Sequence, residues 1–355
     1  MPVWLVLFSL AVTVPGVAQW LEPPPRVATS VGIFDVQSRD EIHRFSASEV
    51  RELVLMENRR PQNVRTVPHP VLVYCFEERT FRYTGGQFQD AEITYRLHTP
   101  KNIQFGRRYP LIVHLHGNGD DSLVHLHSIL PMMIGPDRQD FFMLVTQAPR
   151  SGPGRGWQFR PTRDGSLDIV VAAMEHVIAN NPIDRRRITA TGISGGGWGV
   201  WELIQRYPDT FAGAVPTACS APPPSPRLAA LTRTPIWILN NREDRQVNTE
   251  TIHAAMRVIN GAGGSIALTE MDAPGHNALR YAIEKHDCFR WALAQRRGSW
   301  FSPPPGVTVH KPHSLLFVLF LFILPISIIV FFSWDTICEW ASTVRQTAQE
   351  WISKT

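Results

Sequence analysis

The stretch Gly192-Ile193-Ser194-Gly195-Gly196 has the residue types of a nucleophile carried on a tight turn. It follows a run rich in β-branched residues and opens a helical pattern, the context in which G-x-S-x-G raises a serine hydroxyl above a sheet. The flanking glycines remove side chains that would collide with the turn. The backbone N–H of Gly195 then faces the place where an oxyanion develops. The stretch therefore predicts Ser194 as the nucleophile of an acyl-transfer reaction.

A serine nucleophile needs a general base and an acid that orients the base, and in such sheets they follow in the order Ser, Asp or Glu, His. Asp244 lies just past a predicted strand over residues 235–240, with Glu243 as the local alternative. His276 lies in a loop after the next predicted strand. Two other downstream histidines fall on predicted helix faces, His253 and His286. We expect Ser194, Asp244 and His276 to meet as a triad, each at one of three successive strand ends.

A second stretch, HLHGNGDDSLVHLH over residues 114–127, looks at first like a metal site. Metal-dependent hydrolases of the β-lactamase type use H-x-H-x-D-H, in which a histidine directly follows the acid. Here Asp120 lies four residues after His116, and no histidine comes directly after it. We therefore expect neither a metal nor another cofactor. The Gly117-Asn118-Gly119 turn follows the predicted strand over residues 109–116.

The surrounding pattern indicates the elements that position these residues. Strand patterns occur at 71–76, 80–86, 91–97, 109–116, 141–147, 186–192, 235–240 and 265–271. Helical patterns occur at 46–58, 167–181 and 249–264. The first has Ser46 and Glu49 at capping-box spacing, and the second has an apolar stripe over Ile169, Val170, Ala173, Met174 and Val177. Alternating strands and helices predict an α/β fold with a mostly parallel central sheet and helices on both faces.

With these motifs together, residues 90–295 resemble α/β-hydrolase esterases of the polyhydroxybutyrate-depolymerase, feruloyl-esterase and "predicted peptidase" group. The resemblance is carried by YPLIVHLHGNGDD, by the elbow segment around Ser194, by TPIWILNNREDRQV and by GHNALRYAI. It implies a metal-free Ser-His-Asp mechanism, with Asn118 supplying the second oxyanion N–H beside Gly195. The chain departs from the pattern at Asn240-Asn241, where many relatives have a histidine-glycine pair.

Aromatic residues near these motifs are candidates for a substrate cleft. Trp157 and Trp198 are expected to line it. For Trp201, one turn into the predicted helix, core packing is at least as well supported. The sequence does not name the acyl or alcohol group of the ester.

The sequence patterns at both ends of the chain are typical of targeting segments. Residues 1–18 predict a signal peptide, 19–65 an N-terminal extension, 66–300 the hydrolase domain and 301–313 a proline-rich spacer. Leu315–Phe332 contains no charge and is long enough for a membrane helix, predicted over 314–333. Residues 334–355 would form a cytoplasmic tail, which places the hydrolase domain on the exported side of the membrane.

The composition of the chain favours a globular protein and gives no support for nucleic-acid binding. A hydrophobic fraction of 44% and a net charge of +4 over 355 residues indicate a globular chain without a nucleic-acid-binding run. Cys75, Cys219 and Cys288 would allow one disulfide on the exported side. We expect a membrane-anchored serine hydrolase acting on carboxylic esters. The alternatives are a serine peptidase of the same fold and an inactive, hydrolase-like binding or scaffold protein.

Overall fold

The computed structural model describes residues 27–29, 32–34, 44–59, 70–86, 88–149, 156–157 and 166–298. The predicted signal peptide, the spacer, the membrane helix Leu315–Phe332 and the tail lie outside these residues. Within the described ranges, no helix is both long enough and apolar enough to cross a membrane.

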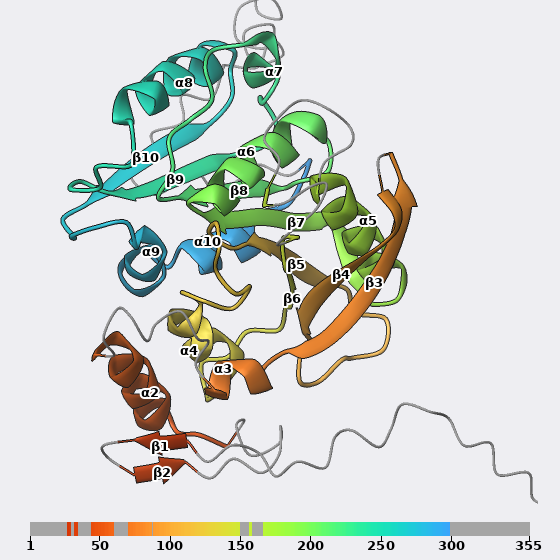
Figure 1. The fold of residues 1–355 in the computed structure, drawn as a ribbon, viewed down its shortest axis with the longest axis vertical. Helices are drawn as coiled ribbons and strands as arrows, with labels where there is room; N and C mark the ends of the chain where they lie inside the picture. Colours follow the sequence, from red (N-terminus) through yellow and green to blue (C-terminus); the bar gives the residue numbers. More distant parts are fainter. Residues whose placement is uncertain are drawn as a thin grey trace, which may run out of the picture. The chain divides into compact units, whose positions relative to one another are not determined.

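The elements alternate along the chain as the sequence pattern predicts (Figure 1). The strands are β1 (Val27–Thr29), β2 (Gly32–Phe34), β3 (Glu77–Gly85), β4 (Phe88–His98), β5 (Tyr109–Leu115), β6 (Phe142–Thr146), β7 (Ile183–Ile193), β8 (Gly213–Thr217), β9 (Ile236–Asn241) and β10 (Ile266–Met271). The helices are α2 (Ala47–Arg59), α3 (Pro70–Tyr74), the short 3-10 helix η2 (His127–Ile129), α4 (Leu130–Met133), α5 (Ser166–Ala179), α6 (Gly195–Arg206), α7 (Pro226–Ala229), α8 (Thr249–Gly261), α9 (Ala278–His286) and α10 (Cys288–Ala294).

Eight of these strands form one sheet in the order β10-β9-β8-β7-β5-β6-β4-β3. The six strands from β10 to β6 are parallel, and β4 and β3 extend the sheet in antiparallel pairings. The predicted mostly parallel sheet is therefore confirmed. The chain leaves β5 toward β6 on one side and returns to β7 on the other. The carboxyl ends of β5 and β7 thus form the switch point where ligands bind in such sheets.

Helices cover both faces of the sheet, as predicted (Figure 1). α6 contacts β5, β7 and β8, while α10 contacts the same three strands from the other side. α8 packs on β10, and α9 packs on β8 and β9. The central strands are consequently buried on both faces, and every residue of β5 is buried.

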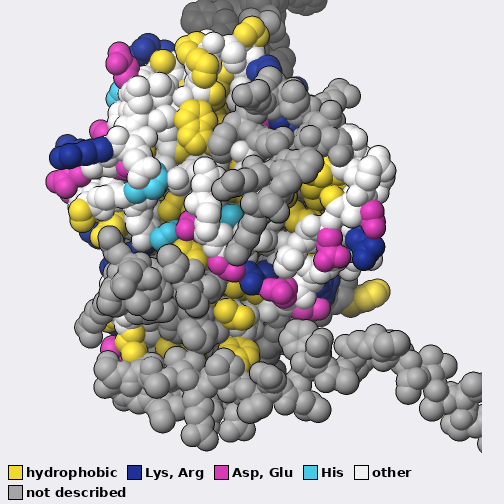
Figure 2. All heavy atoms as spheres, in the orientation of Figure 1, with side chains coloured by type: hydrophobic (Ala, Val, Ile, Leu, Met, Phe, Trp, Pro, Cys, Tyr) yellow, Lys and Arg dark blue, Asp and Glu magenta, His cyan; other side chains and the backbone are white. Residues whose placement is uncertain are grey.

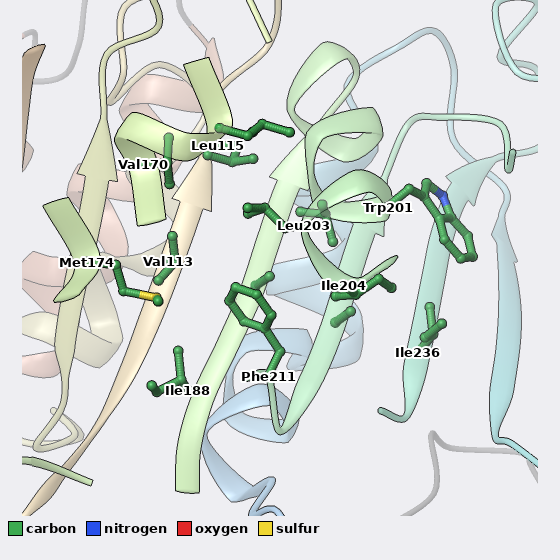
Figure 3. Close-up of a cluster of buried hydrophobic side chains, with 14 of the residues drawn as sticks. Val113, Leu115, Val170, Met174, Ile188, Trp201, Leu203, Ile204, Phe211 and Ile236 are labelled. Carbon is green, nitrogen blue, oxygen red and sulfur yellow. The ribbon is translucent and has the colours of Figure 1, made fainter. Parts of the chain in front are cut away.

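The apolar stripe predicted for α5 is confirmed, because each of its five members is at most 1% exposed. Figure 3 shows Val170 and Met174 of this helix beside Val113 and Leu115 of β5 in the main core cluster. Burying each such side chain contributes about 1.5–3 kcal/mol relative to an exposed one. This packing fixes α5 against the sheet.

Residues 71–76, predicted as a strand, belong instead to the short helix α3 and the turn after it, so that prediction is wrong. A strand would place Val71 and Val73 on the same face. Val71 is fully buried whereas Val73 is 44% exposed, and the buried residues recur with helical spacing. Pro70, at the first position of the helix, is the signal that favours a helix start.

Strand β8 (Gly213–Thr217) is not among the strands predicted from the sequence. It is five residues long, lies between β7 and β9 in the sheet, and is completely buried. The three strands whose ends carry Ser194, Asp244 and His276 are therefore β7, β9 and β10, and they are not successive. A short apolar run without alternation gives little periodic signal.

The capping box of α2 is confirmed by two reciprocal hydrogen bonds. The Ser46 N–H donates to the Glu49 carboxylate at 2.7 Å, and the Glu49 N–H donates to Ser46 Oγ at 3.3 Å. Bonding from Ser46 lowers the pKa of Glu49. α2 contacts η2 and α4, with Val50 and Leu53 buried. This helix of the N-terminal extension is thus packed on the hydrolase core.

On the face shown in Figure 2, Lys and Arg side chains lie interspersed with Asp and Glu side chains over the described surface. Neither sign of charge covers this face alone. The mixed pattern agrees with the small formal net charge of +4.

Candidate active site

Ser194 lies on a strained turn between β7 and α6. Its backbone φ is 54° and ψ is −118°, a conformation that L-residues other than glycine rarely adopt. The turn is held from the neighbouring strand, because the Ser194 N–H donates to the Thr217 carbonyl of β8 at 2.9 Å. Such strain persists only where the surroundings impose it, and it is common at functional sites.

The glycines on either side of Ser194 are required by close backbone contacts. A Cβ atom on Gly192 would lie 2.5 Å from the Gly196 carbonyl oxygen. A Cβ atom on Gly196 would lie 2.0 Å from the carbonyl oxygen of Leu115, at the end of β5. Real side chains do not fit at these distances. Gly197 also has a close neighbour, since its Cβ would lie 2.6 Å from Cys219 Sγ. The third glycine, which the motif does not explain, lets α6 pack on the segment after β8.

Gly196→Ala is expected to lower the free energy of unfolding by at least about 2 kcal/mol, because neither the turn nor β5 can move without losing strand pairing. Gly261→Ala is the matched control, since a Cβ there meets nothing within 4 Å. We expect the control to be neutral or to stabilise by up to about 1 kcal/mol. Urea unfolding of both variants measures the difference. Equal stabilities would contradict this account of the turn.

The structure brings His276 and Asp244 to Ser194. His276 Nε2 lies 2.7 Å from Ser194 Oγ, and His276 Nδ1 lies 2.7 Å from Asp244 Oδ2. The second Asp244 oxygen accepts the backbone N–H of Gln246 at 3.0 Å. The Asp244 side chain is only 1% exposed, whereas the His276 side chain is 29% exposed. The acid is shielded, and the imidazole remains accessible to a substrate.

Asn241 is a residue of this site that the sequence pattern did not assign. Its side-chain N–H groups donate to the carbonyl oxygens of Pro274 at 3.2 Å and Gly275 at 2.8 Å. These two carbonyls directly precede His276. Asn241 therefore holds the loop that carries the histidine. The only signal in the sequence is its departure from the histidine-glycine pair of the resembled family.

The neighbouring Asn240 holds a different segment. Its carboxamide accepts the Cys219 N–H and donates to the Cys219 carbonyl, both at 3.2 Å. The pair Asn240-Asn241 at the end of β9 thus fixes the backbone after β8 with one side chain and the histidine loop with the other.

Asn241→Asp keeps the shape of the side chain but removes both N–H donors. We expect this change to lower kcat by about 10–100-fold, because losing two hydrogen bonds worth roughly 1 kcal/mol each loosens the position of His276. KM should change little. Steady-state kinetics with Asn260→Ala, an exposed asparagine in α8, as control tests this expectation. A larger rise in KM than fall in kcat would contradict a positioning role.

Asn118 lies against the turn that carries Ser194. A Cβ atom on Gly195 would lie 2.2 Å from Asn118 Oδ1, so the asparagine side chain fills the space that glycine leaves. As the first residue of α6, Gly195 has a backbone N–H that no preceding helical turn accepts. The structure thus brings together the two residues expected to form an oxyanion hole.

The loop around Asn118 is held by charged groups of the adjacent strand. Arg96 of β4 pairs with Asp121 at 2.7 Å, and Asp121 accepts the Leu123 N–H at 3.1 Å. Asp121 therefore links this loop to β4 and fixes the backbone at Leu123. Asp120 lies in the same turn, where its N–H donates to the Gly117 carbonyl at 3.2 Å.

The rings of His114 and His116 are both engaged with protein groups. His116 Nε2 accepts the Ala148 N–H at 2.9 Å, so its Nδ1 carries the proton and donates to the Gly117 carbonyl at 2.6 Å. His114 is fully buried beside Thr191. Burial, and then the nearby His116 and His125, lower its pKa to about 3. Among the described residues, no group of three or more His, Cys, Asp or Glu side chains gathers to hold a metal.

A cavity of about 480 Å³ opens beside the Asn118 turn. It is lined by His116, Asn118, Gly119, Asp120, Gln147, Ala148, Pro149, Gly156 and Trp157. Trp157 is only 3% exposed, and its indole N–H donates to the His116 carbonyl at 2.7 Å. This tryptophan contributes a wall of the cavity and supports the end of β5.

Two other tryptophans near the elbow pack with the core. Trp198, expected at the cleft, is partly buried and packs against the main hydrophobic cluster. Trp201 is 1% exposed within that cluster, where Figure 3 shows it beside β8 and β9. The core alternative for Trp201 is confirmed. The described cysteines Cys75, Cys219 and Cys288 are buried and free, so the disulfide that the sequence allowed is absent among them.

Comparison with known proteins identifies the fold. A model of the prolyl oligopeptidase family matches residues 138–222, which include Ser194 but end before Asp244 and His276. No curated protein sequence matches the chain.

Solved structures with a similar fold include esterases and a peptidase. A thermostable esterase aligns with a TM-score of 0.54 and 24% identity, over 64% of this chain and 64% of the esterase. An acylaminoacyl peptidase from Pyrococcus horikoshii aligns with a TM-score of 0.48 and 16% identity, over 66% of this chain and 45% of the peptidase. A ferulic acid esterase aligns with a TM-score of 0.47 and 14% identity, over 61% of this chain and 98% of the esterase.

The chain thus spans less than two thirds of the length of the first two of these proteins. It has the α/β-hydrolase fold, consistent with the esterase group that it resembles. The family match is limited to residues 138–222, and the structural similarity to the thermostable esterase shows the fold alone.

Proposed function

We propose that this protein hydrolyses carboxylic esters through an acyl-enzyme formed on Ser194. The observation that carries the proposal is the contact chain from Asp244 through His276 to Ser194, with both links at 2.7 Å. These three side chains follow the carboxyl ends of β9, β10 and β7, at the edge of the sheet where α/β enzymes bind their substrates.

In the first half of the reaction, Ser194 Oγ attacks the ester carbonyl carbon while His276 Nε2 accepts the hydroxyl proton. Asp244 holds the Nδ1–H tautomer and stabilises the imidazolium. The backbone N–H groups of Gly195 and Asn118 donate to the oxyanion, and each such donor stabilises the transition state by about 3 kcal/mol. The bond to the alcohol oxygen then breaks, and His276 returns its proton to the leaving alcohol.

In the second half, water attacks the acyl carbon of the ester on Ser194. His276 accepts a proton from this water and then donates it to Ser194 Oγ as the acyl–oxygen bond breaks. The carboxylic acid leaves and the free serine is restored. No metal or other cofactor takes part in these steps.

Peptide hydrolysis is the second candidate, favoured by the match of residues 138–222 to the prolyl oligopeptidase family. The same contact chain would cleave an amide, with His276 protonating an amine instead of an alcohol. We favour esters because they need less protonation of the leaving group, and because the resemblance extends to esterase motifs on both sides of the matched segment.

A fluorophosphonate probe tests whether the site is active at all. We expect the probe to form a covalent adduct on Ser194 in the full-length protein, identified by peptide mass spectrometry, because only an activated serine attacks phosphorus at a useful rate. A panel of matched p-nitrophenyl esters and anilides then distinguishes esterase from peptidase. Absence of labelling in a folded protein would favour an inactive, hydrolase-like binding protein.

We also propose that the protein is anchored in a membrane through Leu315–Phe332, with the hydrolase domain on the exported side. The uncharged length of this segment and the apolar stretch near the N-terminus support the proposal.

A further inference from the structure

The connection between β4 and β5 displays two apolar side chains to solvent. Phe105 is fully exposed, at 108% of its reference area, and Ile103 is 51% exposed. Among the described residues, only Leu55 and Val73 join them as exposed large hydrophobic side chains, at 40% and 44%. Phe105 and Ile103 lie two residues apart in the same connection, so their exposed side chains form an apolar tip on this loop.

The loop holds these side chains outward through Tyr109, the first residue of β5. The Tyr109 hydroxyl accepts the Gln104 N–H at 2.8 Å and donates to the Asn102 carbonyl at 3.2 Å. The Arg107 N–H donates to the Gln104 carbonyl at 3.2 Å, and the Arg107 guanidinium lies over the Tyr109 ring. The backbone on both sides of Ile103 is therefore fixed, and the apolar exposure is built into the turn.

Cationic side chains lie in this loop and in two segments next to the start of β5. Three flank it in sequence, and five more come from the start of β7 and the segment after α10. They are Lys101, Arg107, Arg108, Arg185, Arg186, Arg187, Arg296 and Arg297. These eight cationic residues, together with Ile103 and Phe105, are called the basic edge.

Hydrogen bonds join the three parts of the basic edge. Arg108 donates to the carbonyl of Ile183, at the start of β7, at 3.2 Å. Arg186 donates to the Arg297 carbonyl at 2.8 Å, and Arg297 donates to the Arg185 carbonyl at 3.2 Å. Segments far apart in the sequence therefore present their positive charges together.

The pKa of Arg187 reflects this crowding. Burial lowers it, Asp184 raises it, and the positive charges of Arg296 and Arg107 lower it further. The influence of both arginines on Arg187 indicates that the three cations share one neighbourhood.

Carboxylates compensate only part of this charge. Asp140 pairs with Arg107 at 3.1 Å, Glu175 with Arg185 at 2.7 Å and Asp184 with Arg296 at 2.8 Å. Arg108, Arg186 and Arg297 donate to backbone carbonyls, which carry no full negative charge to neutralise them. The basic edge is therefore a cationic surface with an apolar tip.

The basic edge lies opposite the candidate active site. Tyr109 and Ile183 begin β5 and β7, and they are paired in the sheet. Ser194 follows the other end of β7. The described chain ends at Gly298, next to Arg297, and residues 299–313 separate it from the membrane helix predicted over 314–333. At about 3.3 Å per residue this segment spans at most about 50 Å, so a membrane helix at this position would limit how far Arg297 can lie from the bilayer.

We propose that the basic edge docks on the surface of a bilayer containing anionic phospholipids. Phe105 and Ile103 enter the interface between headgroups and acyl chains, and the arginines bind lipid phosphates. Aromatic and aliphatic side chains beside clustered Lys and Arg have the chemistry that this interface favours. Docking in this way directs the opening around Ser194 away from the bilayer, toward water-soluble substrates. The proposal rests on the proposed membrane anchor and does not depend on the hydrolytic reaction.

Spin labels on the full-length protein in vesicles test the docking. Phe105→Cys and, as a control at the opposite edge, Asp272→Cys are labelled in a Cys338→Ser background, since the described cysteines are buried. We expect vesicles of phosphatidylcholine and phosphatidylglycerol to reduce collisions of the label at 105 with a water-soluble nickel chelate several-fold, and to raise its collisions with oxygen. The label at 272 should remain fully accessible to the chelate.

A charge variant tests the role of the cations. Lys101→Gln/Arg108→Gln should return the label at 105 to water, whereas Arg257→Gln/Arg290→Gln, which removes two charges elsewhere, should not. Thermal unfolding by circular dichroism verifies that each variant is folded. Equal chelate access at 105 and 272 in anionic vesicles would overturn the proposal. So would the same protection in pure phosphatidylcholine, or spin–spin broadening in detergent that reveals a second copy covering Phe105.

Discussion

Ser194→Ala is expected to reduce kcat for a p-nitrophenyl ester by about 10⁵–10⁶-fold, the loss that follows removal of the nucleophile in serine hydrolases with this arrangement. The methyl group cannot attack a carbonyl, and the oxyanion donors alone leave only a small residual rate. The hydroxyl contributes little to the core, because Ser194 is only partly buried and its side-chain bond is to His276. Stability should therefore be nearly unchanged.

The control for this variant is Ser48→Ala, which alters an exposed serine in α2. It should retain full activity. Initial rates are measured over a wide range of substrate concentration, so that a trace of contaminating wild-type enzyme is recognised by its unchanged KM. A Ser194→Ala protein that keeps more than a few per cent of kcat would exclude Ser194 as the nucleophile.

Asp244→Asn is expected to lower kcat by about 10⁴-fold while leaving the fold intact. An asparagine amide turned toward His276 donates where the carboxylate accepted. It therefore favours the tautomer whose proton lies on Nε2, facing Ser194. That histidine cannot accept the serine proton. The charge that stabilises the imidazolium is lost as well.

Glu243→Gln is the matched control, since it neutralises the adjacent carboxylate. Glu243 is exposed, whereas the Asp244 side chain is 1% exposed and 2.7 Å from His276. We expect the Glu243 variant to keep kcat within about twofold, as is usual for exposed positions without buried partners. The pH dependence of kcat/KM for both variants identifies which acid acts on the histidine. A larger loss for Glu243→Gln would reverse the assignment.

Proximity in sequence explains why the elbow was predictable. The contact that requires glycine at position 192 arises within five residues, because it is made with Gly196 inside the motif itself. The stripe of α5 and the capping box of α2 are also local, because their partners lie three or four residues apart. Such patterns can be read without knowledge of the rest of the chain.

The order Ser, Asp, His could also be recognised in the sequence. The contacts between these three side chains, however, join residues that are far apart in the chain. Ser194 and His276 are 82 residues apart, and Asp244 and His276 are 32 apart. The sequence identified candidates at strand ends. Their approach to 2.7 Å depends on the order of β7, β9 and β10 in the sheet, and on the unpredicted β8 between β7 and β9.

Short-range sequence patterns thus predicted the nucleophile turn, the fold class and the candidates for the general base and the orienting acid. Only tertiary packing revealed that Asn241 holds the histidine loop, that Trp201 belongs to the core and that Val71–Tyr74 is helical. It also brought the arginines of three separate segments to one edge beside Phe105. The physical reason is that a side chain's role depends on burial and on partners distant in the chain, whereas a sequence pattern reports only the preferences of neighbouring residues.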